Sequence, residues 1–292
     1  MMIRHFTAIA VCIVVISIGG CARATSSSRS RSDQYSALKL PLTLARRPDW
    51  MIAASAIRRI DAAGGATIVA RYLNNPQTTI ITGRNISPIL RPWRVSFAFD
   101  ARSLKAIRVA LNAGLSARIT RILYDPEHWI FTPRSQQVNV GASVREAAAL
   151  AHGSNRQLIA APATDLAKAR TSGGSVATSF LRSNDLGQTA ASADWVEIQA
   201  QGLERIPTKY AVYIKKAVRQ IRGISQSVVI YAGLSTNPSG PMVTISELIA
   251  DIRLTSHDVS GYWLNVPIQG NACPRCGAPR PELAIDLLEI VR

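Results

Sequence analysis

The chain has 292 residues, of which 47% are hydrophobic, and it carries a formal net charge of +16 at pH 7. The hydrophobic content is ample for a folded core, and the length without a leader, about 270 residues, fits one large α/β domain or two small ones. The basic residues are mostly arginines dispersed through the chain, with no recognition helix or RNA-binding signature, which argues against a nucleic-acid-binding protein. We interpret the charge either as attraction to anionic lipid headgroups or acidic cell-wall polymers, or as an Arg-rich composition without a specific partner.

The first residues have the pattern of an export signal. Two basic residues precede an apolar run, Phe6–Ile18, and small residues then lead to Cys21. The run is shorter than the roughly 20 residues that a membrane-spanning helix needs. The "IGGC" segment resembles the lipobox of bacterial lipoproteins, whose cysteine is lipidated and becomes the first residue after cleavage. The resemblance implies a signal peptide at 1–20 and a lipid anchor at Cys21, on the outer side of the cytoplasmic membrane. The alternative is an ordinary signal peptide, or an uncleaved anchor, with an unrelated cysteine.

Residues 21–36 are rich in serine and arginine and have little to bury, as expected of a solvated tether before a folded domain at 37–292. Two cysteines of that domain, Cys273 and Cys276, form a C-x-x-C pair. Outside the cytoplasm a disulfide is the default state of such a pair, and no second pair supplies the other half of a zinc site. A thioredoxin-like redox role is the alternative, which the prolines between the pair and the last predicted helix disfavour.

Strand-like and helix-like segments alternate along this domain. The predicted strands cover residues 37–45, 66–73, 93–100, 118–125, 156–162, 194–201, 227–235 and 259–267. The predicted helices cover residues 49–64, 103–114, 144–153, 208–223, 244–255 and 281–291, with a long polar loop after the second strand and a partly helical, Ser/Gly-rich connection at 164–190.

Eight strands, most of them followed by a helix, predict a parallel sheet with right-handed crossovers. Eight such units over about 250 residues have the size of a (β/α)8 TIM barrel, which is the fold we predict. The alternative is an open doubly wound sheet, but no glycine-rich phosphate loop follows any of the strands.

Two carboxylates stand at the end of the fourth predicted strand, in "YDPEHW". Active sites of TIM barrels lie at the C-terminal ends of the strands, and residues two apart in a strand share a face. Asp125 and Glu127 could therefore both point into the barrel mouth, where neighbouring like charges raise the pKa of a carboxyl and allow it to act as a general acid. In the alternative interpretation Asp125 accepts hydrogen bonds from the loop, Pro126 ends the strand and Glu127 pairs with an arginine.

Polar and aromatic residues at three other strand ends could complete a pocket. These candidates are Glu197, Gln199 and Gln201 on one face of the sixth strand, Ser235 and Asn237 after the seventh, and Tyr262, Trp263 and Asn265 near the end of the eighth. Polar side chains in a buried strand are costly unless they meet a polar cavity or one another. Aromatic faces beside carboxylates and amides suit a sugar ring, although Trp263 alone is equally compatible with a core position.

The motifs "YDPEHW", "IQAQGLER", "AGLSTNP", "GYWLNVP" and "CPRCGAPRPELAI" resemble those of a group of uncharacterised exported bacterial proteins and lipoproteins with a glycoside-hydrolase-like barrel. More distantly, the Asp125-x-Glu127 pair on the fourth strand, with Trp263 on the eighth, is similar to the layout of family 18 chitinases. In that family the Glu protonates the leaving oxygen and the Asp two residues before it orients the acetamido group of the substrate. The sequence departs from the family's D-x-x-D-x-D-x-E pattern, because Thr120 and Leu123 occupy the first two Asp positions.

The sequence thus predicts a lipid-anchored, exported barrel that acts on polysaccharide of the cell envelope or outside the cell. Glu127 is the predicted proton donor, with Asp125 or Glu197 as the second acidic group, in a retaining or an inverting arrangement. The alternative is a non-catalytic envelope lipoprotein whose barrel binds polysaccharide or a protein partner. No cofactor is expected, and the scattered histidines of the domain, His128, His152 and His257, disfavour a metal hydrolase.

Overall fold

The computed structural model describes residues 44, 46–170, 175–238, 242–271 and 273–291. The predicted signal peptide, the lipidation site Cys21 and the tether lie outside the described residues, as does nearly all of the first predicted strand, 37–45. Within the described part of the chain, no helix is both long enough and hydrophobic enough to cross a membrane.

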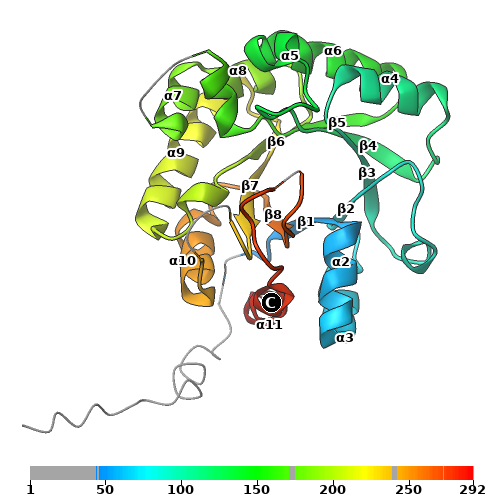
Figure 1. The fold of residues 1–292 in the computed structure, drawn as a ribbon, viewed down its shortest axis with the longest axis vertical. Helices are drawn as coiled ribbons and strands as arrows, with labels where there is room; N and C mark the ends of the chain where they lie inside the picture. The colour runs from blue at the N-terminus through cyan, green and yellow to red at the C-terminus, as the bar shows by residue number, and fades with distance from the viewer. Residues whose placement is uncertain (1–43, 45, 171–174, 239–241, 272, 292) are drawn as a thin grey trace, which may run out of the picture. The chain divides into compact units, whose positions relative to one another are not determined.

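Eight parallel strands form a closed barrel in which each strand pairs with its neighbours in the sequence and β8 returns to β1 (Figure 1). The strands are β1 (Asp49–Ala53), β2 (Thr79–Thr82), β3 (Ser96–Ala101), β4 (Ile119–Tyr124), β5 (Gln157–Ala160), β6 (Trp195–Ile198), β7 (Val229–Ser235) and β8 (Gly261–Asn265). Helices lie between successive strands and surround the barrel, so the prediction of a (β/α)8 TIM barrel is confirmed.

The barrel closes between β1 and β8, where Asp49 pairs with Gly261 and Met51 with Trp263. The backbones come close at this seam: a Cβ atom on Gly261 would lie 2.2 Å from the carbonyl oxygen of Asp49. Any side chain larger than hydrogen would therefore push the two strands apart.

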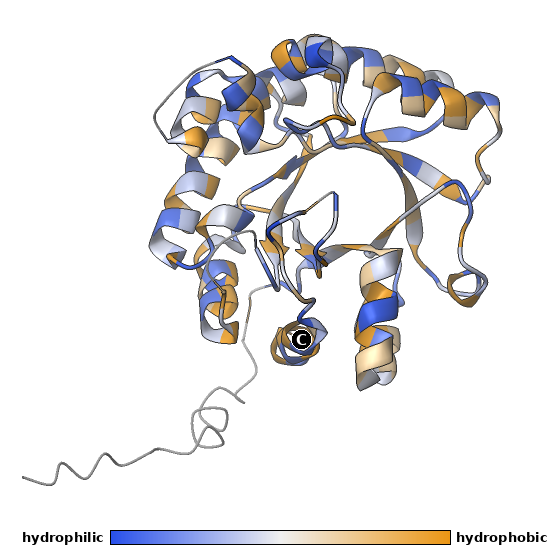
Figure 2. Ribbon diagram, in the orientation of Figure 1, coloured by the Kyte–Doolittle hydropathy of each residue, from blue (hydrophilic) through white to orange (hydrophobic). Residues whose placement is uncertain are grey.

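The surrounding helices are amphipathic, and Figure 2 shows hydrophilic and hydrophobic residues on each of them. The α-helices are α2 (Ala54–Ile60), α3 (Ala66–Leu73), α4 (Leu104–Asn112), α5 (Arg134–Val138), α6 (Val140–Gly153), α7 (Val176–Arg182), α8 (Asp185–Ala190), α9 (Pro207–Ile224), α10 (Ile245–Thr255) and α11 (Pro281–Ile290). Two short 3-10 helices, η3 (Thr164–Ala169) and η4 (Gln201–Leu203), follow β5 and β6. The helix predictions after the third strand and beyond are confirmed in place.

The start of the chain is where the sequence-based assignment is wrong. The segment 66–73, predicted as a strand from its β-branched residues, forms α3, because Val69, Tyr72 and Leu73 recur at helical spacing and are all buried. The residues 49–53, predicted as the start of a helix, form β1, and β2 lies in the segment predicted as a polar loop. The predicted number of strands is eight, as in the barrel, but β1 and β2 are not the first two predicted segments.

The barrel interior is filled by side chains rather than open. Inward-pointing residues from successive strands pack into one cluster, which consists of Met51, Ile81, Ala98, Leu123, Ile159, Ala161, Tyr231 and Trp263. Nearer the N-terminal ends of the strands, the guanidinium of Arg121 lies 4.2 Å from the ring centre of Trp195 and donates a 2.6 Å hydrogen bond to Thr79 Oγ1. The filled interior leaves the C-terminal ends of the strands as the place for a pocket.

Candidate functional site

A cavity of about 420 Å³ opens at the C-terminal ends of the strands, and we call it the mouth cavity. Its lining includes Arg59, Asp100, Arg102, Asp125, Glu127, Trp129, Gln199, Gln201, Ser235, Trp263, Asn265, Cys273 and Cys276. The structure therefore brings together seven of the residues that the sequence singled out for the pocket: Asp125, Glu127, Gln199, Gln201, Ser235, Trp263 and Asn265.

Asp125 follows β4 directly and is almost fully buried. Its backbone N–H donates to Ala101 O (3.0 Å), which continues the β3–β4 pairing by one residue. One carboxyl oxygen accepts a 2.8 Å hydrogen bond from Gln199 Nε2, which also donates to Ala161 O. Burial raises the pKa of Asp125 well above its usual range, and the neighbouring carboxyl of Glu127 raises it further.

Glu127 is half-buried, and it lies on the short loop after β4. Its backbone N–H donates to Thr132 Oγ1 (3.3 Å), and the same hydroxyl accepts from the indole Nε1 of Trp129 (2.8 Å), so the loop is held together by its own side chains. Burial and the nearby carboxylate of Asp165 raise the pKa of Glu127 to about 8, although the positive charge of Arg102 opposes this. Glu127 therefore carries a proton at neutral pH, as a general acid requires.

Glu197 lies on β6 and is fully buried, and it does not line the mouth cavity. Neither carboxyl oxygen has a hydrogen-bond partner among the described residues, and burial raises its pKa well above the usual range. Space for the side chain comes from Gly233 on β7: a Cβ atom there would lie 2.6 Å from Glu197 Oε1 and 2.3 Å from Gln201 Nε2. The structure thus places Glu197 deeper in the barrel than the other predicted acids, as a neutral group.

The structure adds functional candidates that the sequence reading missed. Asp100 is the penultimate residue of β3, where it pairs with Leu123 of β4, and burial raises its pKa as well. Arg102 Nε lies 3.9 Å from the Asp100 carboxylate, and its guanidinium lies 4.9 Å from the ring centre of Trp129 and 5.2 Å from that of Phe131. The motif "FDAR" at a predicted strand end was the signal for these residues, because it parallels "YDPE" on the next strand.

Two predicted substrate-binding residues have other partners. Tyr262 lies on the outer face of β8, where its hydroxyl is 2.9 Å from Thr255 Oγ1 on α10 and donates to Ile252 O. Side chains alternate along a strand, so Trp263 points into the barrel and Tyr262 does not. Asn237 is buried and donates from Nδ2 to the carbonyl oxygens of Cys276 and Ala278. Tyr262 is therefore a core residue, and Asn237 holds a loop.

That loop forms one wall of the mouth cavity. Cys273 and Cys276 are joined by a disulfide and both line the cavity. The loop is fixed at its other side by a 2.9 Å hydrogen bond from Gln269 N to Gly277 O, with Gly277 in the left-handed region at φ +70°. The two cysteines thus shape the entrance of the cavity.

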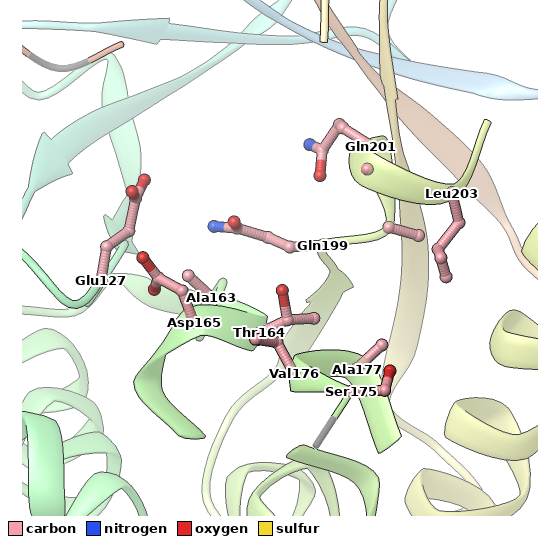
Figure 3. A pocket seen from close by; sticks show the side chains of 12 residues that line it. Glu127, Ala163, Thr164, Asp165, Ser175, Val176, Ala177, Gln199, Gln201 and Leu203 are labelled. Atoms are coloured by element: carbon pink, nitrogen blue, oxygen red, sulfur yellow. The ribbon is translucent and has the colours of Figure 1, made fainter. Parts of the chain in front are cut away.

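A second cavity of about 400 Å³, the side cavity, adjoins the first (Figure 3). Both cavities are lined by Glu127, Gln199 and Gln201, and the side cavity adds Asp165 of η3 and Ser175 at the start of α7. In Figure 3 the side chain of Gln199 extends toward Glu127 and Asp165 from the opposite side. Glu127 consequently stands at a junction between two cavities, and a ligand could pass it on both sides.

No group of three or more His, Cys, Asp or Glu side chains in the described part of the chain is placed to hold a metal ion. Two of the histidines pair with carboxylates instead: His152 Nε2 lies 2.8 Å from Asp194, and His257 Nε2 lies 3.4 Å from Asp258.

No protein-family model and no curated protein matches the sequence. Solved structures of similar fold include a chitinase from Chromobacterium violaceum, at 10% identity and a TM-score of 0.47 over 84% of this chain and 99% of that one. They also include a GH128 endo-β-1,3-glucanase from Sorangium cellulosum, at 8% identity and a TM-score of 0.48 over 78% of this chain and 94% of that one. A third is the spore cortex-lytic enzyme SleL from Bacillus megaterium, at 10% identity and a TM-score of 0.45 over 84% of this chain and 74% of that one. These values show a distant likeness to glycoside-hydrolase barrels in fold alone.

Proposed function

We propose that the protein is a glycoside hydrolase acting on polysaccharide of the cell envelope or outside the cell, with Glu127 as the proton donor. The observation that carries the proposal is the protonated, half-buried Glu127 beside Asp125 in a cavity at the mouth of the barrel. A TIM barrel uses this end for catalysis, and a carboxyl with a raised pKa beside a second carboxyl is the arrangement that glycosidases need.

In the proposed reaction the Glu127 carboxyl gives its proton to the glycosidic oxygen as the bond from that oxygen to the anomeric carbon breaks. Asp125 is held by Gln199 through one carboxyl oxygen, so the other oxygen can interact with the substrate. Water then adds to the anomeric carbon, and the proton that it loses returns to a carboxylate of the site. Asp125 serves either as that base or as the group that positions the substrate for attack.

Aromatic and amide groups around the two acids suit a sugar. Trp129 and Trp263 line the mouth cavity, and the indole Nε1 of Trp263 has no partner within the described part of the chain. The amides of Gln201 and Asn265 line the same cavity and supply further hydrogen-bonding groups. A sugar ring needs both kinds of contact, because its C–H faces are apolar and its hydroxyls bind polar groups.

The predicted export signal supports a substrate outside the cytoplasm. On this proposal the signal peptide at 1–20 is removed, and a lipid on Cys21 holds the enzyme to the outer side of the cytoplasmic membrane. Conversion of Cys21→Ser is expected to release the protein from membranes or to block its processing, as membrane fractionation would show. Wild-type fractionation and migration of the variant would contradict the anchor without affecting the catalytic proposal.

The decisive experiment is a panel of envelope polysaccharides incubated with the wild type, Glu127→Gln and the surface control Glu289→Gln. General acids contribute about 10² to 10⁴-fold to rate, so cleavage should fall at least about 100-fold in Glu127→Gln while the melting temperature and ligand binding are retained. The control should cleave as the wild type does, because Glu289 is exposed on α11. Cleavage that survives in Glu127→Gln would remove the assignment, and binding without cleavage by the wild type would make the protein a carbohydrate-binding lipoprotein instead.

A further inference from the structure

A third cavity lies next to the two already described, and we call it the basic cavity. It has a volume of about 420 Å³ and is lined by Gln201, Gly202, Leu203, Arg205, Ile206, Lys209 and Pro238. Gln201 lines all three cavities, and Pro238 also lines the mouth cavity. The three cavities are therefore neighbours around Gln201, with Glu127 in the lining of two of them and two cationic side chains in the lining of the third.

The two cations of the basic cavity are not neutralised by the protein. Arg205 and Lys209 are exposed, and neither side chain is in an ion pair or a hydrogen bond with a described residue. No acidic side chain lines the cavity within the described part of the chain, and the first turn of α9 has none.

The nearest acid along the chain, Glu204, turns away from the cavity. It is fully buried, and its Oε1 accepts a 2.5 Å hydrogen bond from Ser235 N. Burial raises the pKa of Glu204 well above its usual range, which favours its uncharged form. Two positive charges consequently face solvent beside the apolar surfaces of Leu203, Ile206 and Pro238.

We propose that the basic cavity is a subsite for an anionic sugar residue, one that carries a carboxylate or a phosphate group, while a neighbouring residue of the same polymer lies at Glu127. This inference rests on the proposed function and names its substrate class: an acidic polysaccharide. Arginine and lysine bind such groups through charge-assisted hydrogen bonds, and the apolar residues offer a surface for the sugar ring. The mouth cavity is lined by three carboxyl groups, Asp100, Asp125 and Glu127, together with Arg59 and Arg102.

Binding measurements in the Glu127→Gln background test the subsite without requiring cleavage. The probes are hyaluronan, which carries carboxylates, a poly(glycerol phosphate), which carries phosphates, and chitin hexasaccharide, which is uncharged. Into this background we would introduce Arg205→Gln with Lys209→Gln, and separately Lys216→Gln with Arg219→Gln. The second pair removes the same charge from exposed positions of α9 that line none of the three cavities.

Loss of the two cavity charges should weaken binding of at least one anionic polymer about tenfold and leave chitin hexasaccharide within about twofold. The anionic polymer that responds identifies the group that the subsite takes. The control pair should change all affinities by less than about twofold. Raising the salt concentration from about 0.05 M to about 0.5 M should abolish most of the difference, because the screening length shortens.

The inference is overturned if neither anionic polymer binds, if the cavity pair and the control pair weaken binding equally, or if the uncharged oligosaccharide responds as strongly. Its failure is distinguishable from failure of the proposed function. If the wild type cleaves uncharged glycan and the Arg205→Gln with Lys209→Gln substitutions do not change binding, only the proposal of an anionic subsite is refuted. If the wild type binds the anionic polymer through Arg205 and Lys209 but does not cleave it, only the catalytic assignment of Glu127 is refuted.

Discussion

The two ends of the barrel interior treat their charged groups in opposite ways. Near the N-terminal ends of the strands, Arg121 is surrounded by partners: Thr79 and Gln157 accept its hydrogen bonds, and Trp195 stacks on it. At the C-terminal ends, the carboxyl groups of the mouth cavity crowd together with few partners, and Glu197 beneath them has none within the described residues. The buried charge of Arg121 therefore has its partners within the protein, whereas the carboxyl groups of the mouth cavity remain available to a ligand.

The largest expected effect on stability is at Arg121, near the N-terminal ends of the strands. Conversion of Arg121→Ala removes two hydrogen bonds and the stacking on Trp195, and we expect the free energy of unfolding in urea to fall by about 2 kcal/mol. Arg253→Ala, at an exposed position of α10, should change it by less than about 0.5 kcal/mol. An equal and small effect of both substitutions would mean that the contacts of Arg121 do not stabilise the barrel.

A substitution of Glu197, beneath the mouth cavity, is expected to change the free energy of unfolding in the opposite direction. Glu197→Met replaces an unpartnered buried acid by an apolar side chain of similar length, and it should raise the free energy of unfolding by about 1 kcal/mol at pH 7. A destabilised Glu197→Met protein would show instead that this acid has a structural partner, and the contrast between the two ends would not hold.

The pH dependence of cleavage tests the protonation of Glu127 in the mouth cavity. Cleavage should decline as pH rises above about 8, because Glu127 loses its proton there. The Arg102 guanidinium lowers the pKa of Glu127, whereas Asp165 and Asp100 raise it, so Arg102→Gln should move the alkaline limb of the profile to higher pH. Loss of cleavage at every pH with no displacement of the limb would indicate that Arg102 only supports Trp129.

The smallest effect is expected at a buried acid outside the barrel. Asp251 of α10 is fully buried without a hydrogen-bond partner among the described residues, and burial raises its pKa to about 9. Because the folded protein binds this proton more tightly than the unfolded chain, its contribution to stability is complete below about pH 4 and is lost as pH rises through 9. Asp251→Asn should flatten the alkaline fall of the melting temperature and leave cleavage unchanged. An identical fall in the variant would assign the alkaline instability to other groups.

Much of the fold was predictable because its signals are local. β4 to β8 each follow or precede a helix with clear periodicity, and Asp125 and Glu127 were found because they end such a strand. β1 was missed because it runs directly into α2, and β2 because its four residues, all buried, lie within a long polar segment. A buried run of this kind is defined by the strands beside it, which the local sequence does not specify.

The site was predictable in part, for a related reason. Position at a strand end placed Trp263 and Gln199 correctly at the mouth, but the face of a strand on which a residue lies decides whether it reaches the cavity, and Tyr262 lies on the wrong face. Asp100 and Arg102 were overlooked because "FDAR" holds one carboxylate and not the pair that marks "YDPE". Their importance comes from the contact of Arg102 with Asp100 and Trp129, which only the folded chain creates.

The closure of the barrel between β1 and β8 has a consequence for the order in which the protein folds. The strands that meet at Gly261 lie at opposite ends of the domain, so β1 has only β2 beside it until almost the whole chain is present. Pairing across such a long separation in sequence is slow, because the entropy of closing the loop is lost before the contacts form. The mouth cavity, whose walls come from residues on both sides of this seam, is therefore complete only once β1 and β8 have paired.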